Sequence, residues 1–175
     1  NVLSRDWDLL IVLDGCRADS LNAVINELDI EYEWDTIWST GSQTSEWMAN
    51  TFTSEFSEVA RDITVVTAHP YSEGSLDACQ LGGLDEVWRV AWDDSLGTVP
   101  PRPVTEQSIH RARGTNDRVL LHYLQPHYPF IADDAPTSMD ETNLLDESKS
   151  GLNDEVWWNA LKYGRTDPDS VRTSY

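Results

Sequence analysis

Lysine is nearly absent from this sequence, and basic residues are few. Twelve lysines and arginines stand against 31 aspartates and glutamates, so the formal net charge is −19, and only Lys149 and Lys162 are lysines. Binding to a phosphate backbone or to anionic lipid needs clustered Lys and Arg. The shortage therefore argues against nucleic acid or an anionic membrane surface as a partner.

Long apolar runs and cysteine pairs are missing as well. The longest apolar run, Leu9 to Leu13, is shorter than a signal-peptide core and far below the roughly 20 residues of a membrane span. We therefore expect a cytoplasmic protein with no membrane span. Cys16 and Cys79 form neither a metal-binding spacing nor a disulfide framework, and Cys16 is expected to be a small buried thiol.

Acidic residues are plentiful, and they are spread along the whole chain instead of being gathered in a tail. Salt at 1 M shortens the Debye length to about 3 Å, which screens the self-repulsion of such a surface. A dispersed acidic surface with almost no lysine therefore predicts a halophilic protein of a high-salt cell. The alternative is an acidic surface in an ordinary mesophile.

The length of 175 residues fits one domain with a real core, and 39% of the residues are hydrophobic. The apolar run at 9–13 predicts a strand buried on both faces, which is typical of a parallel sheet. Apolar segments within 63–71 and 118–130 repeat the pattern of a strand followed by a polar loop, and 86–92 is a shorter strand candidate.

Helical patterns lie between the predicted strands. We expect helices from about Ser20, over 45–61 with Thr44 or Ser45 as N-cap, and over 104–113. This alternation predicts an α/β fold with a mostly parallel sheet flanked by helices. The first helix is predicted from apolar residues at steps of three and four, which are Leu21, Val24, Ile25 and Leu28.

Asp14 follows the first predicted strand directly. The carboxyl ends of parallel strands carry the ligand site of such sheets, and a carboxylate there is a hard oxygen ligand for a divalent cation. An aspartate at this point also suits a simple cap of the following turn. Arg17 and Asp19 are expected to pair within that turn and to fix its shape.

The stretch GSQTSEWMANTF, residues 41–52, places several hydroxyl groups at a loop-to-helix junction. Helix N–H groups stabilise an anion at such a junction, and a hydroxyl becomes a nucleophile when a base or a metal activates it. A metal held by Asp14 next to Ser42 or Thr44 would provide that activation. The same hydroxyls also suit helix caps, and the spacing alone leaves both interpretations open.

His127 lies in a loop after a predicted strand, between two prolines that fix the loop and suit holding a side chain in place. His69 also follows a strand, so Asp14, His69 and His127 are all expected at the carboxyl edge of the sheet, although the sequence identifies no partner for His69. His122 alternates inside a strand and is expected to be a packed or hydrogen-bonded core histidine, and His110 is expected on a helix surface. The tryptophans expected to pack in the core and loops are Trp34, Trp38, Trp47 and Trp92.

Three stretches follow one another in order, namely DLLIVLDGCRADSL, GSQTSEWMANTF and LLHYLQPHYPF. Together they resemble the N-terminal half of sulfatase-like proteins of the alkaline phosphatase superfamily, above all the acidic haloarchaeal set. The resemblance implies the fold of a metal-dependent esterase, with Asp14 as metal ligand, the nucleophile in the hydroxyl loop and His127 on the sulfate or phosphate. It also implies an anionic ester substrate and a divalent metal, which would be Ca or Mg, or else Zn or Mn.

The family motif, Cys-x-Pro-Ser-Arg with a later Thr, places Ser42 at the nucleophile, Ser45 at the motif serine and Thr51 at the threonine. Ser42 is therefore preferred to Thr44 as the nucleophile. Residue 42 is not cysteine, so the formylglycine of true sulfatases cannot form there from cysteine. Thr44 and Glu46 replace the Pro and Arg of the motif, and the chain contains no later segment that resembles SDHG.

We expect a hydrolase of sulfate or phosphate esters that uses a hydroxyl nucleophile. Residues 1–175 would form the N-terminal part of one sulfatase-like domain, incomplete at the C-terminus and inactive alone. A long acidic loop is expected at 133–154, followed by a helix at 155–165 and the start of another at 166–175. The alternative is a noncatalytic or degenerate α/β binding domain.

Overall fold

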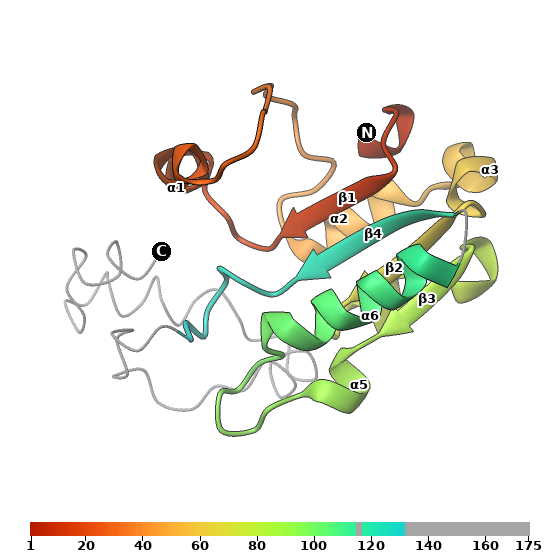
Figure 1. Cartoon of the computed structure of the whole chain (residues 1–175). Helices are drawn as coiled ribbons and strands as arrows, with labels where there is room; N and C mark the ends of the chain where they lie inside the picture. The colour runs from red at the N-terminus through yellow and green to blue at the C-terminus, as the bar shows by residue number, and fades with distance from the viewer. Residues whose placement is uncertain (115–116, 132–175) are drawn as a thin grey trace.

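A computed structural model describes residues 1–114 and 117–131, and a sheet of four parallel strands forms its centre (Figure 1). The strand order is β1-β4-β2-β3, and all three pairings are parallel. The predicted α/β class with a parallel sheet is confirmed. The predicted loop and helices over 133–175 lie outside the described residues. The strands are β1 (Leu9–Leu13), β2 (Ile63–Thr67), β3 (Gly83–Glu86) and β4 (Arg118–Tyr123).

The two central strands, β2 and β4, carry the core. Every residue of β2 is buried, which fits its run of β-branched side chains between two covered faces. On one face Val66 and Leu121 pack in a cluster with Val104 of α6 (Pro101–Gly114). On the other face Val65 and Leu120 pack with residues that include two aromatic side chains of the 47–52 region.

β1 is an edge strand, so the prediction that it is buried on both faces is wrong for the described part of the chain. Leu10 and Val12 pack into the core, but Leu9, Ile11 and Leu13 are 52%, 52% and 38% exposed. Helix α6 packs against β4 and β2 and makes far less contact with β1. An apolar run predicts a strand but does not say which of its faces is covered.

The first helix, α1 (Ala18–Val24), begins two residues before the predicted start and continues as the 3-10 helix η2 (Ile25–Glu27). It stands away from the sheet in Figure 1. None of its residues is buried, and Val24 and Leu28 of the predicted apolar face are 49% and 53% exposed. The periodicity therefore located the helix, while nothing in the described residues covers its apolar face fully.

The single helix predicted over 45–61 is wrong, because the chain forms three short pieces there. They are α2 (Thr44–Thr51), the 3-10 helix η3 (Ser54–Phe56) and α3 (Ser57–Ala60). Phe52 leaves the helical region, and Thr53 is extended, so the ladder of backbone hydrogen bonds is interrupted. The predicted caps are also wrong: α2 has Gln43 at its N-cap and Thr44 as its first residue.

The strand predicted at 86–92 is mostly wrong. β3 ends at Glu86, and the chain then turns into the short helix α5 (Trp88–Ala91). Glu86 and Arg89 pair at a distance of 2.6 Å within that one turn, and Trp88 packs against the core from the helix. The predicted helix at 104–113 is confirmed within α6, whose first residue is a proline, as is favourable at a helix start.

Three short elements complete the described fold, which are η1 (Val2–Ser4), α4 (Ser72–Ser75) and η4 (Ala78–Gln80). The helices of residues 1–114 and 117–131 all lack the combined length and apolarity needed to cross a bilayer. Helix α2 covers one face of the sheet and α6 covers the other, so neither helix lies across the carboxyl ends of the strands. This carboxyl edge carries the site.

Candidate functional site

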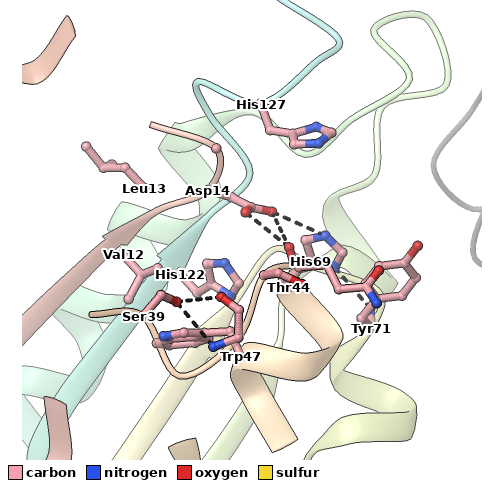
Figure 2. Close-up of a pocket in the computed structure, with 14 residues that line it drawn as sticks. Val12, Leu13, Asp14, Ser39, Thr44, Trp47, His69, Tyr71, His122 and His127 are labelled. Carbon is pink, nitrogen blue, oxygen red and sulfur yellow. Dashed lines mark hydrogen bonds and ion pairs between the residues drawn. The ribbon is translucent and has the colours of Figure 1, made fainter. Parts of the chain in front are cut away.

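Three strands end at the same edge of the sheet, and each is followed by a polar residue. Asp14 follows β1, His69 follows β2 and His127 follows β4, as the sequence predicted. All three line one pocket of about 350 Å³ (Figure 2). The carboxyl edge of a parallel sheet is the usual place of a ligand site, so the prediction that these signals converge is confirmed.

Thr44 and Asp14 meet at the centre of this pocket. The hydroxyl of Thr44 donates to both carboxylate oxygens of Asp14, at 3.1 Å each. Thr44 is the first residue of α2, and the N–H of Asp14 is held by the carbonyl of Tyr123 at the end of β4. A strand end and a helix start therefore present one hydroxyl directly to one carboxylate.

His69 is the second partner of Asp14. Its Nε2 lies 3.3 Å from Oδ2 of Asp14, and its side chain is only 4% exposed. Its other ring nitrogen, Nδ1, accepts the N–H of Tyr71 at 3.1 Å. Because Nδ1 is an acceptor, the proton of a neutral ring must sit on Nε2, the nitrogen that lies beside Asp14.

Burial sets the charge of His69. Desolvation lowers its pKa to about 3, and the nearby Asp14 carboxylate, which favours the charged form, only partly opposes this effect. His122 and His127 lower the pKa further through like charge. His69 is therefore neutral at neutral pH, and its contact with Asp14 is one between a neutral ring and a carboxylate rather than an ion pair.

Ser42, the preferred nucleophile of the sequence prediction, lies at the exposed rim of the same pocket. Its hydroxyl and its N–H both donate to Oε2 of Glu46, at 2.8 and 2.7 Å. These two bonds lower the pKa of the Glu46 carboxyl. Of the two candidate hydroxyls, Thr44 faces Asp14, while Ser42 is used in a capping contact with the first turn of α2.

Gly41 explains why this loop can lie so close to α2. A Cβ built at Gly41 would stand 2.3 Å from the backbone nitrogen of Trp47 and 2.7 Å from the carbonyl carbon of Glu46. No side chain fits there. The other motif hydroxyl, Thr51, is fully buried and shares a hydrogen bond of 2.9 Å with the hydroxyl of Thr40, so it joins the same loop to α2 from behind.

His127 lies across the pocket from Thr44 (Figure 2). Its Nδ1–H donates to the carbonyl of Tyr128 at 2.6 Å, which orients the ring. Gly15 allows this approach: its φ is +66°, and a Cβ built there would lie 3.3 Å from Cδ2 of His127. The turn after Asp14 thus needs glycine both for its left-handed backbone and for room beside the imidazole.

His122 is 1% exposed, which confirms the prediction of a buried histidine in the strand. The structure adds that its ring also lines the pocket. The ring stacks on His69 at a centroid distance of 5.7 Å and meets the ring of Trp47 at the same distance. Sequence reasoning missed this role, although strand alternation places His122 on the same sheet face as Thr67, its neighbour in the β2–β4 register.

The turn after β1 carries the pair predicted from the sequence. Nε and an amino nitrogen of Arg17 donate to the two carboxylate oxygens of Asp19, at 2.9 and 2.7 Å. The bond from Arg17 lowers the pKa of Asp19 to about 2. The pair is exposed and does not line the pocket. Cys16 is partly rather than fully buried, and burial raises the pKa of its thiol.

Two of the four tryptophans do not pack as predicted. Trp34 and Trp38 are 46% and 95% exposed, because the loop that carries them has no core beside it among the described residues. Trp47 lines the pocket, and Trp92 packs against a core cluster. His110 is exposed on α6, as expected.

A metal site is not complete on the described residues. They contain no group of three or more His, Cys, Asp or Glu side chains that would hold a metal ion. Ca takes about six to eight oxygen ligands and a zinc site about four ligands. Asp14 offers one carboxylate, and His69 directs a protonated nitrogen toward it, so the donor set seen here does not fit a divalent cation.

Comparisons with protein-family models, with curated proteins and with solved structures returned no match for this chain.

Proposed function

We propose that this pocket is the reaction site of an ester hydrolase in which the hydroxyl of Thr44 attacks a sulfate or phosphate ester. The observation that carries the proposal is the pair of hydrogen bonds from Thr44 to Asp14 inside the pocket. A hydroxyl needs a base beside it to act as a nucleophile at neutral pH, and this one is held against a carboxylate. An alkaline-phosphatase-like fold of sulfatase type belongs to the same proposal.

The proposed reaction begins with proton transfer from Thr44 to Asp14. The threonine oxygen then bonds to the sulfur or phosphorus, the bond to the ester oxygen breaks, and the leaving alcohol takes up the proton from Asp14. Water next attacks the covalent intermediate, which releases sulfate or phosphate and returns the proton to Thr44. His69 lies beside Asp14, with Nε2 3.3 Å from Oδ2, and limits the positions that the carboxylate can take.

Two features support an anionic ester as the substrate. Helix α2 begins at Thr44, which lines the pocket, so the N–H groups of its first turn lack partners within the helix and would stabilise a negative charge beside it. His127 stands on the opposite side of the pocket. Neither Lys nor Arg is among the described residues that line the pocket, so helix N–H groups and imidazoles are the donors available there.

The donor set on the described residues does not fit a metal, so no step of the proposed reaction passes through one. Whether the activity needs a metal cofactor is tested by adding Ca, Mg, Mn or Zn in separate experiments. Asp14 is the residue that would contribute a ligand if the activity required a cation. A noncatalytic binding domain is the second candidate, and it is favoured by the same incomplete donor set.

The test is to trap the covalent intermediate on the purified 175-residue chain in concentrated KCl. The chain is incubated with an aryl phosphate or an aryl sulfate, with and without each cation, quenched in acid and mapped by peptide mass spectrometry. We expect a phosphoryl or sulfuryl group on the peptide that contains Thr44, together with release of the aryl alcohol. This differs from the sequence-based expectation that the chain is inactive alone, because Thr44 and Asp14 already meet within the described residues. No adduct and no alcohol in any arm would overturn the hydrolase, and anion binding without either product would support the binding domain.

A further inference from the structure

His122 holds a buried polar group that the reaction above does not use. The residue lies on β4, level with Val12 on β1 and Thr67 on β2, so it sits near the carboxyl ends of the strands, beside the pocket that it lines. Its exposed fraction is 1%. Buried imidazole nitrogens usually pair with protein or with water, and each such nitrogen therefore calls for a partner.

Thr67 satisfies one nitrogen of this ring. The hydroxyl oxygen of Thr67 accepts the backbone N–H of His69 at 3.0 Å, and it lies 3.4 Å from Nδ1 of His122. A hydroxyl oxygen has two acceptor sites, so this contact fits either tautomer of His122, and a donor role for Nε2 requires the one in which the Thr67 hydroxyl donates to Nδ1. Burial lowers the pKa of His122, which favours the neutral ring, and in this tautomer the remaining proton sits on Nε2.

The Nε2–H of His122 has no hydrogen-bond partner among the described residues. The rings of Trp47 and His69 flank the His122 ring, and neither side chain contains an oxygen that could accept the Nε2–H. His122 turns Nδ1 toward Thr67. It therefore presents the other side of its ring, which carries Nε2, to the pocket that it lines. Figure 2 shows the ring beside Trp47 below the level of Asp14.

We propose that His122 is a ligand-binding residue of this pocket, whose Nε2–H donates to a terminal oxygen of the bound anionic ester. The ester would then be held from the pocket floor by His122 and from the side by the first turn of α2. This inference rests on the proposed function, because it assumes that an oxyanion occupies the pocket. It assigns His122 a binding role beyond that of a packed core histidine.

Phosphate titration followed by NMR separates the two proposals. Long-range proton–nitrogen spectra of the labelled chain resolve the imidazole nitrogens, and free protein should show His122 with its proton on Nε2. Inorganic phosphate is then added in concentrated KCl. We expect the Nε2 signals of His122 and the backbone amide of Thr44 to shift with the same apparent Kd. If Thr44 shifts and His122 does not, the role of His122 is overturned and the proposed function stands; if neither shifts, both fail.

Two substitutions sharpen the test. His122→Phe keeps a flat ring beside Trp47 but removes the donor, whereas His122→Gln keeps a side-chain N–H. Loss of one hydrogen bond to a charged group should weaken phosphate binding about 10- to 100-fold in the Phe variant. The Gln variant should recover part of this loss.

His110→Gln, on the exposed surface of α6, is the matched control and should bind phosphate as the wild type does. Thermal unfolding of each variant reports whether it folds. A folded His122→Phe variant with wild-type phosphate affinity contradicts the proposal. Should that variant fail to fold, the titration of the wild-type chain decides the question alone.

Discussion

The hydroxyl of Thr44 donates to both carboxylate oxygens of Asp14, although 30 residues separate the two in the sequence. The contact joins the end of an edge strand to the start of a helix on one face of the sheet. It also brings the hydroxyl next to the helix N-terminus, where negative charge is stabilised. The predictions that follow test this relationship and the parts of the fold that hold it.

The two candidate hydroxyls should differ sharply on substitution. Thr44→Ala removes the group that faces Asp14 and should abolish both the covalent adduct and ester turnover. Ser42→Ala removes a hydroxyl that bonds to Glu46 at the rim and should leave the adduct on Thr44. The measurement is peptide mass mapping after reaction with aryl phosphate and aryl sulfate. Loss of the adduct in Ser42→Ala, with retention in Thr44→Ala, would return the nucleophile to Ser42.

Asp14→Asn tests the base. The amide keeps the size of the side chain and can still accept the Thr44 hydroxyl, but it cannot take up the proton. General base catalysis contributes about 10²- to 10⁴-fold, so the rate of aryl alcohol release should fall by about that factor. Asp19→Asn, which changes a carboxylate outside the pocket, is the matched control and should leave the rate unchanged. Equal rates in wild type and Asp14→Asn would remove Asp14 from the reaction.

Stability should depend on pH through His69. The pKa of this residue is about 3 in the folded chain, against about 6.5 for an unperturbed histidine, so the unfolded chain binds more protons between these values. The stabilising effect is fully present above about pH 6.5 and is lost as the pH falls toward 3, with a slope of up to about 1.4 kcal/mol per pH unit.

This pH dependence is measured as the free energy of unfolding in denaturant between pH 7 and 5. That window lies above the range in which the carboxylates with lowered pKa values titrate. His69→Gln should reduce the slope, leaving the part that comes from His122, whose pKa burial also lowers, and His110→Gln, at an exposed position, should not change it. A slope that is the same in wild type and His69→Gln would show that His69 is not buried in its neutral form.

Gly41 should tolerate no side chain. Gly41→Ala places a Cβ 2.3 Å from the Trp47 nitrogen, so the loop or α2 must shift, at a cost of about 1–3 kcal/mol in unfolding free energy. Gly74→Ala, in the helix α4 with nothing within 4 Å of the new Cβ, should be neutral or stabilising by up to about 1 kcal/mol. Chemical denaturation compares the two, and equal stability of both variants would contradict the close approach.

Salt should stabilise this chain. A net charge of −19 produces self-repulsion that shrinks as the Debye length falls from about 10 Å at 0.1 M to about 3 Å at 1 M. The midpoint of thermal unfolding should therefore rise as KCl is increased from about 0.1 to about 3 M. A flat or falling midpoint would contradict the halophilic interpretation. Potassium sulfate at matched ionic strength shows how much of any rise comes from ion type instead of screening.

Much of the framework could be predicted from local patterns. Apolar runs located the strands β1, β2 and β4, because a strand buried in a parallel sheet needs a nearly continuous run of apolar side chains. The convergence of Asp14, His69 and His127 followed from one rule, since parallel strands end at a common edge. The pairing of Arg17 with Asp19 could be predicted because the two residues are near neighbours in one turn.

Other features could not be predicted, because they depend on contacts between distant segments. The match to the family motif favoured Ser42 as the nucleophile. Because α2 begins at Thr44, however, the Thr44 hydroxyl donates to Asp14, and the Ser42 hydroxyl donates to Glu46. The segment after Glu86 has the apolar residues of a strand, yet it forms a helical turn in which Trp88 packs onto the core.

The sequence by itself determined the α/β class, the approximate positions of most elements and the edge of the sheet at which the polar residues gather. These depend on spacing and composition within short windows, where side-chain period and strand length suffice. Tertiary structure alone decided which hydroxyl meets Asp14, which nitrogen of His69 carries a proton and which faces of β1 and α1 are covered. Those outcomes depend on distances and burial between residues far apart in the chain, and no local pattern encodes them.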